Sequence, residues 1–323
     1  MTLTPTAPNL PPTTAAAAHR RGRVRQSARW MRWRPHLVGW AFSFPFVAIF
    51  AVFLAVPILV SFVLSFTEFR LPQLRDWFSA DYVGLDNYRE LIHDDRFLQA
   101  ARNTAVYVLF GVPLTLGAGL AAAVGLNQSL GKLRSLFRVG FYLPVVTSIV
   151  AISVIWRYLL QADSGLVNAA LDRIGIDGPD WLAEPSTALG SIIALGVWRN
   201  FGFDMVVFLA ALQGVDPTLY EAARVDGAGP WTIFYRITLP LLRPAILFLA
   251  IVTSTGYLQV FEESFVLTAG GPRDSTLSVS MYVYEQGFRF INFGYSSAIA
   301  YTLFAAIAAL AFLQFRLLRS EAM

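Results

Sequence analysis

The segment from Leu219 to Ala245 reads LYEAARVDGAGPWTIFYRITLPLLRPA and is a polar stretch in a strongly apolar chain. It carries Glu221, Arg224, Asp226 and Arg236, with glycines and prolines at regular positions. The whole chain has 323 residues, of which 56% are hydrophobic and 14% are charged. Globular domains average about 25% charged residues, so most of this chain is not built to be soluble. The sequence therefore joins an apolar part to one segment that is typical of a soluble protein.

Six apolar runs surround this segment and predict membrane-spanning helices. A helix needs about 20 mostly apolar residues to cross a bilayer, and a soluble core rarely contains so many runs of that kind. Prolines within the first three runs suggest bent helices, although packing in a bundle explains them equally well. We predict an all-α polytopic membrane protein with these six spans: Leu37–Phe66, Asn103–Asn127, Val139–Trp156, Ala188–Gln213, Pro244–Phe261 and Phe293–Phe315.

The distribution of positive charge predicts the orientation of these spans. Seven arginines and no acid lie between Arg20 and Arg34, just before the first run. That run is about twice as long as the apolar part of a signal peptide, so we expect an uncleaved first helix. If the N-terminus is cytoplasmic, the inside segments hold fifteen of the 25 Lys and Arg residues and the outside loops hold seven. The positive-inside rule then places both termini in the cytoplasm.

The predicted organisation has three parts. Residues 1–35 form a disordered basic cytoplasmic tail, residues 36–319 form the transmembrane domain, and residues 320–323 form a short C-terminal tail. A cytoplasmic loop at residues 214–243 interrupts the transmembrane domain. The outside loops Glu68–Leu98 and Asp163–Thr187 are long and polar. They serve either as spacers or as a docking surface.

The sequence argues against a metal or nucleotide site in this chain. It has no cysteine, and its three histidines do not cluster. Residues 125–133, GLNQSLGKL, fit the start of a phosphate-binding loop but end in leucine where serine or threonine would hold magnesium. They also follow an apolar helix and not a buried strand. We therefore expect no bound cofactor, and we expect no nucleic-acid partner because the positive charge is concentrated at one end.

Local signals predict a helix-turn-helix in the opening segment. Asp216-Pro217 is a favourable helix start, because aspartate caps free amides and proline suits the first helical position. Gly227 can adopt the left-handed conformation that ends a helix. A second helix then runs from Trp231 to Leu239, and Pro240 is expected to end it. One apolar face of that second helix gathers Ile233, Phe234, Ile237 and Leu241. This unit would lie on the cytoplasmic membrane surface, either as a plain connector or as a docking element.

The pattern EAA, then D-G-A, then I-x-L-P resembles the EAA loop of permease subunits in binding-protein-dependent ABC importers. Tyr82–Thr104 and Phe261–Tyr301 are similar to segments of the carbohydrate (MalF-like) subfamily. The resemblance implies the ABC type I importer permease fold, with six transmembrane helices and a cytoplasmic coupling helix-turn-helix. It implies that the loop docks on a separate ATPase through these residues: Glu221, Ala222, Ala223, Asp226, Gly227 and Pro240.

The resemblance also implies that the chain lies in the cytoplasmic (inner) membrane of a bacterium and that it works with a set of partners. A second permease subunit would complete a heterodimer in the membrane lipid, and two ATPase subunits would bind ATP and magnesium. An extracytoplasmic solute-binding protein would deliver the substrate. This chain would itself be a non-enzymatic subunit, because ATP hydrolysis would take place on the ATPase.

Polar residues at membrane depth are the candidates for the substrate pathway, because such residues are costly in lipid. Sugars need hydrogen-bonding groups and aromatic faces, and the fourth and fifth spans supply both. Two alternatives stay open: Arg199 and Asp204 pair with each other or with a partner subunit, and Glu262 and Glu263 lie near the outer interface. The candidates are Trp198, Arg199, Asn200, Phe203, Asp204, Tyr257, Gln259, Glu262 and Glu263.

The charges of these candidates favour a neutral sugar over a glycerol phosphate. Asp204, Glu262 and Glu263 are acidic, against the single cation Arg199. Two other classes of protein are weaker alternatives. An ion-coupled secondary transporter commonly shows repeated halves, and we find no clear repeat. A membrane enzyme needs a nucleophile, an acid pair or a metal cluster, and none stands out.

Overall fold

The structure is a computed structural model that describes residues 40–74, 76, 80–127 and 133–318. Its described residues divide into two compact units, with the boundary between Ser61 and Phe62. The predicted tails at residues 1–35 and 320–323 lie outside the described residues, as do residues 128–132 of the phosphate-loop lookalike. Within the described ranges, five helices are long and apolar enough to cross a membrane, and a bent pair of helices can form a sixth span. The predicted all-α membrane architecture is confirmed.

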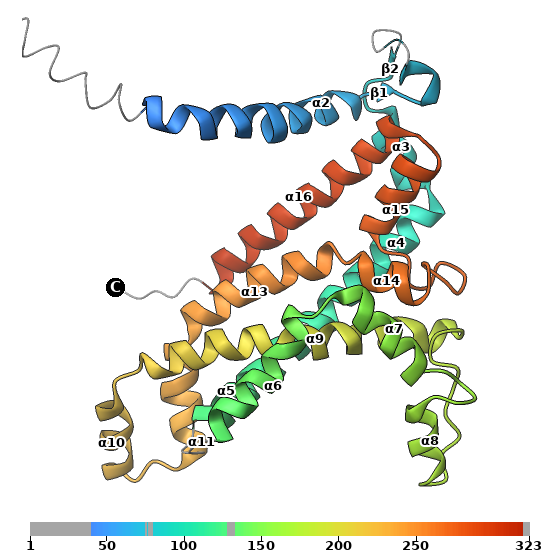
Figure 1. Cartoon of the computed structure of the whole chain (residues 1–323). Helices are drawn as coiled ribbons and strands as arrows, with labels where there is room; N and C mark the ends of the chain where they lie inside the picture. The colour runs from blue at the N-terminus through green and yellow to red at the C-terminus, as the bar shows by residue number, and fades with distance from the viewer. Residues whose placement is uncertain (1–39, 75, 77–79, 128–132, 319–323) are drawn as a thin grey trace, which may run out of the picture. The chain divides into compact units, whose positions relative to one another are not determined.

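Figure 1 labels both strands and most of the α-helices of the described residues. Most are α-helices, η1, η4, η5 and η6 are single π-helical turns, and η2 is a 3₁₀ turn. Two short strands, β1 (Thr67–Glu68) and β2 (Asp81–Tyr82), pair antiparallel. The helical elements are η1 (Ala51–Ala55), α2 (Val56–Leu64), η2 (Leu71–Leu74), α3 (Asp86–His93), α4 (Asp95–Val106), η4 (Tyr107–Gly111), α5 (Val112–Asn127), α6 (Leu133–Val146), α7 (Ile149–Leu159), α8 (Leu166–Asp172), α9 (Pro185–Gln213), α10 (Pro217–Val225), α11 (Pro230–Ile233), η5 (Phe234–Thr238), α12 (Leu239–Leu241), α13 (Arg243–Leu258), α14 (Glu262–Leu267), α15 (Val279–Tyr284), η6 (Glu285–Arg289) and α16 (Phe293–Leu318).

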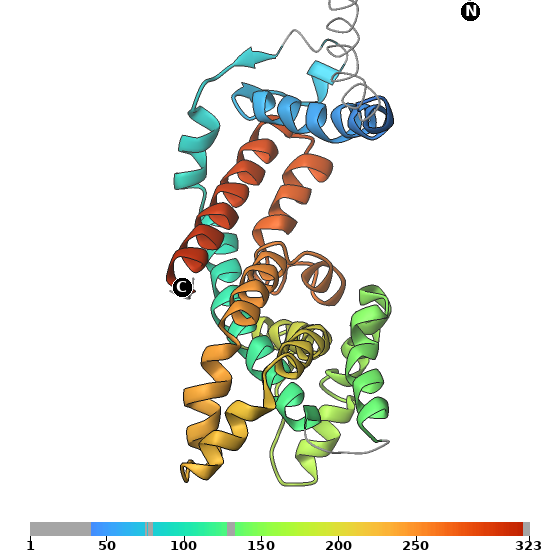
Figure 2. The same ribbon diagram turned by 90° about the vertical axis from the view of Figure 1, so that its left-hand side faces the viewer.

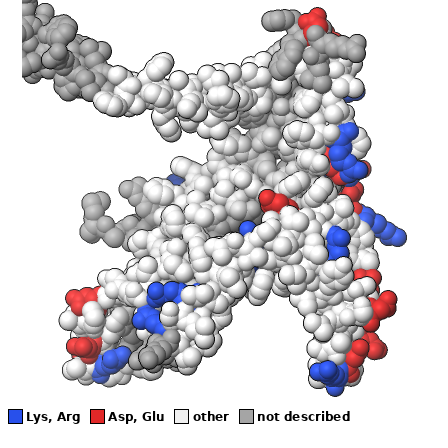
Figure 3. Space-filling view, in the orientation of Figure 1, with Lys and Arg blue, Asp and Glu red and all other residues white. Residues whose placement is uncertain are grey.

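Charged side chains of unit 62–323 gather at the two ends of its spans. In Figure 3, blue and red atoms lie over α10 and α11 at one end and along the edge that carries α3 and α8 at the other. The surface between these ends is mostly white. This distribution suits a bundle whose middle lies in lipid, where ionisable groups are expensive.

The third predicted span differs from a straight helix. The apolar run Val139–Trp156 is divided between α6 and α7, which meet at an angle of 100°. Pro144 lies inside α6 and does not end it. The bend falls at Ser148, whose backbone leaves the helical region with φ −56° and ψ 124°. Apolarity along a run reports contact with lipid or core, but it does not report the direction of the helix axis.

Glycines let α9 pack closely against two neighbouring helices. A methyl group at Gly119 of α5 would come within 2.6 Å of the Asp204 Cβ atom in α9. A methyl group at Gly202 of α9 would meet the backbone carbonyl of Phe141 in α6. Small residues at such contacts allow helix backbones to approach one another in a membrane, where packing replaces the hydrophobic driving force. The glycines therefore fix α9 as the central helix of this part of the bundle.

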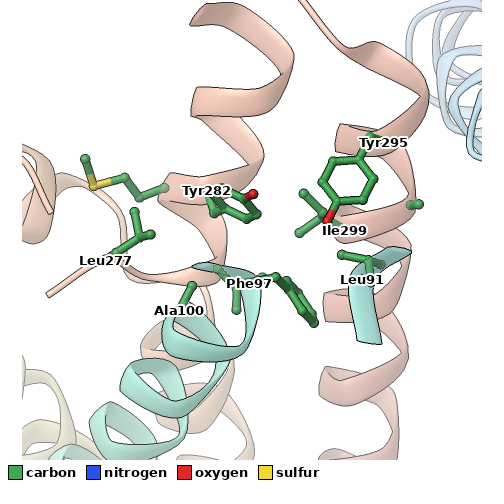
Figure 4. Packing of buried hydrophobic residues seen from close by; sticks show 10 residues of the cluster. Leu91, Phe97, Ala100, Leu277, Tyr282, Tyr295 and Ile299 are labelled. Carbon is green, nitrogen blue, oxygen red and sulfur yellow. The ribbon is translucent and has the colours of Figure 1, made fainter. Parts of the chain in front are cut away.

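A buried apolar cluster joins α3, α4, α15 and α16, as Figure 4 shows. Asp94 lies at its edge and caps α4 by accepting hydrogen bonds from the backbone N–H groups of Arg96 (2.9 Å) and Phe97 (3.3 Å). Its other oxygen accepts from the hydroxyl groups of Tyr282 and Tyr295, each at 2.6 Å. Partial burial opposes ionisation of Asp94, but these four hydrogen bonds hold its pKa below the usual range.

The connection between α14 and α15 is fixed to α4 by a second polar network. Arg96 donates to both carboxylate oxygens of Asp274 at 2.9 Å and to Glu285 at 3.1 Å. The bond from Arg96 holds the pKa of Asp274 below its usual range. Asn103 donates to the backbone carbonyls of Asp274 (2.8 Å) and Leu277 (2.9 Å). These contacts order a loop that the sequence alone leaves undefined.

Asp94→Ala is expected to destabilise the protein at neutral pH by about 1–2 kcal/mol, the usual cost of losing an N-cap. Because the folded-state pKa of Asp94 is lowered, its contribution is complete above the unfolded pKa of about 4 and is lost as the pH falls further. The thermal unfolding midpoints of wild type and variant should therefore converge in acid. Asp95→Ala, which removes the next carboxylate, should have a smaller effect. An equal gap at pH 7 and pH 3 would contradict this assignment.

Candidate functional site

The predicted start and end of the first helix in the 214–243 loop are confirmed. The Asp216 side chain accepts a hydrogen bond from the Thr218 N–H at 2.9 Å, and Pro217 occupies the first turn of α10. Hydrogen bonds from the backbone and side chain of Thr218 lower the pKa of Asp216. Gly227 has φ +78°, in the left-handed region where a side chain is strained. The chain then reverses, and α10 and α11 lie side by side in both ribbon views (Figures 1 and 2).

The prediction that Pro240 ends the second helix is wrong. Helical structure runs from Pro230 through η5 and continues past Pro240 to Leu241. In η5 the Leu239 N–H bonds to the Phe234 carbonyl, five residues earlier. This wider turn makes room for the ring of Pro240, which would clash with the preceding turn of a regular α-helix. Helical geometry therefore continues through Pro240. Of the predicted apolar face, Ile233, Phe234 and Ile237 are half-buried and Leu241 is exposed.

The exposed surface of α10 holds the predicted docking residues. Glu221 and Ala222 are exposed, and Ala223 is half-buried. Asp226, at the end of the helix, is exposed as well. Val225 is 88% exposed, which is unusual for an apolar side chain, and the sequence argument did not single it out. An apolar residue beside an acid and small side chains gives α10 a surface suited to a protein partner.

A cavity of about 380 Å³ lies beside the midpoint of α9. It brings together eight of the nine predicted pathway residues, from two spans that are far apart in sequence. The eight are Arg199, Asn200, Phe203, Asp204, Tyr257, Gln259, Glu262 and Glu263. A cavity of this size, with polar and aromatic walls, can hold a small polar solute.

Arg199 and Asp204 do not pair with each other. Asp204 is buried, and its two oxygens each lie 3.4 Å from the Thr253 hydroxyl. Arg199 makes one hydrogen bond within the described ranges, a long one of 3.4 Å to the side chain of its neighbour Asn200. The Nε atom of Arg199 is buried without any partner among the described residues. The open alternative of an internal ion pair is therefore wrong, and Arg199 faces the cavity with most of its donors free.

Two buried tyrosines shape the walls of the cavity. Tyr257 shares a hydrogen bond of 2.8 Å with Thr115, and its ring lies against Gly111, where a larger residue would collide. The Tyr107 hydroxyl lies 3.0 Å from the Ser264 hydroxyl and donates to the Thr276 carbonyl at 3.2 Å. Tyr107 was missed from the sequence, although a tyrosine inside an otherwise apolar span is a detectable signal.

Three further predicted residues lie in different environments: Glu262, Glu263 and Trp198. Glu263 is buried beside the cavity, whereas Glu262 is exposed. Trp198 does not line this cavity. Its ring lies 5.7 Å from that of Trp156, and it lines a separate apolar cavity of about 1080 Å³ between α5 and α9. Its position one residue before Arg199 rotates it by about 100° around the helix, towards another face.

The chain matches a known family over most of its length. Residues 113–320 match the family described as binding-protein-dependent transport system inner membrane component. The chain belongs to this family. It is a multi-pass inner-membrane permease of an ABC importer, and the predicted family membership is confirmed.

One curated relative and two solved structures place this permease more closely. It is 39% identical over 282 residues to the lactose transport system permease protein LacF of Rhizobium radiobacter, with 86% of this chain and 92% of that protein covered. It matches a bacterial ABC transporter involved in import of the acidic polysaccharide alginate, with a TM-score of 0.76, 26% identity, and coverage of 92% and 100%. A second structure of a bacterial alginate transporter, in complex with an alginate pentasaccharide-bound periplasmic protein, matches with a TM-score of 0.75, 26% identity, and coverage of 89% and 96%.

Proposed function

We propose that this permease forms half of the translocation pathway for a sugar or oligosaccharide delivered by an extracytoplasmic binding protein. The observation that carries the proposal is the cavity beside the midpoint of α9. Arg199 and Asn200 offer donors there, Glu262 and Glu263 offer acceptors, and Tyr257 offers an aromatic ring. Saccharide hydroxyl groups both donate and accept, so they match such a mixed surface. The sugar substrates named for its relatives support this assignment.

The remaining partners follow from the loop at residues 214–243. We assign α10 as the docking element for a separate ATPase, with Glu221 as its charged contact and Gly227 as its turn. This places the loop and both termini in the cytoplasm, in agreement with the arginine distribution. A second permease subunit would complete the pathway as the other half of a heterodimer. ATP and magnesium would bind to the ATPase subunits alone.

Reconstitution tests this proposal directly. The full complex, with its binding protein, is placed in proteoliposomes and supplied with labelled lactose, maltose, xylobiose and glycerol 3-phosphate in turn. We expect uptake of at least one of the three sugars, dependent on ATP and on the binding protein, that continues when ionophores remove ion gradients. Uptake that needs an ion gradient and not ATP would establish a secondary transporter instead. Uptake of glycerol 3-phosphate alone would replace the sugar assignment.

A further inference from the structure

The cavity beside the midpoint of α9 holds an unequal set of charges. Among its described lining residues, Arg199 is the one cation, whereas Asp204, Glu262 and Glu263 are carboxylic acids. Figure 3 shows blue and red atoms near one another in the middle of the drawn face, where the surrounding surface is white. Charged groups are costly at membrane depth, so their number and sign indicate which kind of solute passes through the cavity.

Arg199 forms no direct ion pair within the described part of this chain. No described carboxylate lies within 4.0 Å of its guanidinium group, and its Nε atom is buried and unpaired. Its bond to Asn200 is long, at 3.4 Å. An arginine held in this way is ready to donate to the oxygen atoms of a solute that enters the cavity.

The carboxylates nevertheless keep the cavity from becoming positive. Glu262 is exposed and lines the same cavity, and its carboxylate offsets the charge of Arg199. Asp204 and Glu263 are buried, and each is either neutral or negative. The four groups therefore sum to zero or to a negative charge in every one of these states. An anionic solute would lose its hydration there without a compensating net attraction, whereas a neutral saccharide would meet donors and acceptors together.

We propose that Glu262 and Glu263 form an anion barrier in this cavity, so that the permease passes neutral saccharides and excludes those with carboxylate, sulfonate or phosphate groups. The inference rests on the proposed function, because it assigns a substrate class to the same cavity. The shared fold does not decide this class, since one structural neighbour is described as an importer of an acidic polysaccharide. We assign the choice of substrate class instead to the charged side chains that line the cavity of this chain.

The absence of cysteine from this chain allows a test that needs no known substrate. Val252 lines the cavity and is 40% exposed, so Val252→Cys places one reporter thiol there. Ser135→Cys, at an exposed position of α6 away from the cavity, is the reference thiol. Both are made in the full complex with cysteine-free partner subunits. Each is then treated with cationic and anionic methanethiosulfonate reagents of similar size.

We expect the ratio of cationic to anionic reaction rates at Val252→Cys to exceed the ratio at Ser135→Cys by about tenfold, the scale of one or two nearby charges in a partly dry site. Adding Glu262→Gln, Glu263→Gln or both should lower this excess stepwise and speed the anionic reaction. Arg199→Gln should raise it. Glu184→Gln removes a carboxylate from the start of α9, outside the cavity, and should leave it unchanged.

The barrier is refuted if the ratio of cationic to anionic reaction rates is the same at Val252→Cys as at Ser135→Cys. It is also refuted if Glu262→Gln and Glu263→Gln both leave the ratio at Val252→Cys unchanged. Glu262 is exposed, so Glu262→Gln alone decides the matter if the buried Glu263 variant does not assemble. Failure of the sugar assignment has a different signature. In that case no sugar is taken up by the reconstituted complex, while the reagent rates still report the charge of the cavity.

Discussion

Glu221→Lys is expected to abolish ATP-driven uptake while the chain still inserts into the membrane and assembles with the proposed second permease subunit. The side chain is exposed on α10 and forms no hydrogen bond or ion pair with the described residues, so its loss should not unfold the chain. At an interface, truncating one member of a buried charged pair costs about 2–5 kcal/mol. Reversing the charge adds repulsion, so docking of the ATPase should weaken by at least about 30-fold.

Gly227→Pro tests the same element through its turn. The residue has φ +78°, which proline cannot adopt, and its N–H bonds to the Arg224 carbonyl at 3.1 Å. We therefore expect loss of uptake as severe as that of Glu221→Lys. Gly229→Ala is the matched control, because that glycine has an ordinary negative φ of −73° and open space around it. Uptake that survives both Glu221→Lys and Gly227→Pro, measured beside co-purification of the ATPase, would remove α10 from the coupling role.

Gly202→Ala is expected to produce the second large effect, by separating α6 from α9. The added methyl group would meet the backbone carbonyl of Phe141, which cannot move aside as a flexible side chain can. Overpacking of this kind typically costs about 1–3 kcal/mol. Both helices contribute to the cavity, α6 through Val145 and α9 through Asn200 and Phe203. A lower thermal midpoint and a loss of uptake should therefore occur together.

Gly190→Ala provides the control within the same helix. A methyl group there meets nothing within 4 Å, and alanine favours the helix over glycine by about 1 kcal/mol. Its thermal midpoint and uptake should equal or exceed those of the wild type. If Gly202→Ala behaves like Gly190→Ala, the close approach of α6 to α9 has no importance for stability or transport.

Most of the predictions that the structure confirms rest on signals from residues close together in sequence. Asp216, Pro217 and Gly227 each act through backbone atoms a few residues away, so their positions alone define α10 and its turn. The apolar runs likewise reflect a local requirement, since each must satisfy its own backbone in lipid. Charged residues inside such a run attract attention for the same reason, which explains why Arg199 and Asp204 were found.

Features that depend on partners distant in sequence escaped the prediction. Tyr107 and Asn103 donate hydrogen bonds to the loop after α14, about 170 residues later, and the sequence around them does not indicate that contact. The bend at Ser148 depends on how α6 and α7 pack against α9 and α14, since the run around it is uniformly apolar. The π turn before Pro240 escaped the prediction for a local reason, because the rule that proline ends a helix assumes regular spacing of the earlier turns.

The continuity of α9 with α10 has a mechanical consequence. Three residues, Gly214 to Asp216, separate α9, a helix of 29 residues, from α10. At about 1.5 Å per residue α9 is about 44 Å long, so a tilt of about 5° about Pro185 moves Gln213 by about 4 Å and Arg199 by about 2 Å. If α10 docks on the ATPase as proposed, α9 would act as a lever, and Arg199 would move about half as far as the end of α9 beside α10. Changes in distance measured with labels at Gln213 and Arg199 would give the ratio of the two displacements.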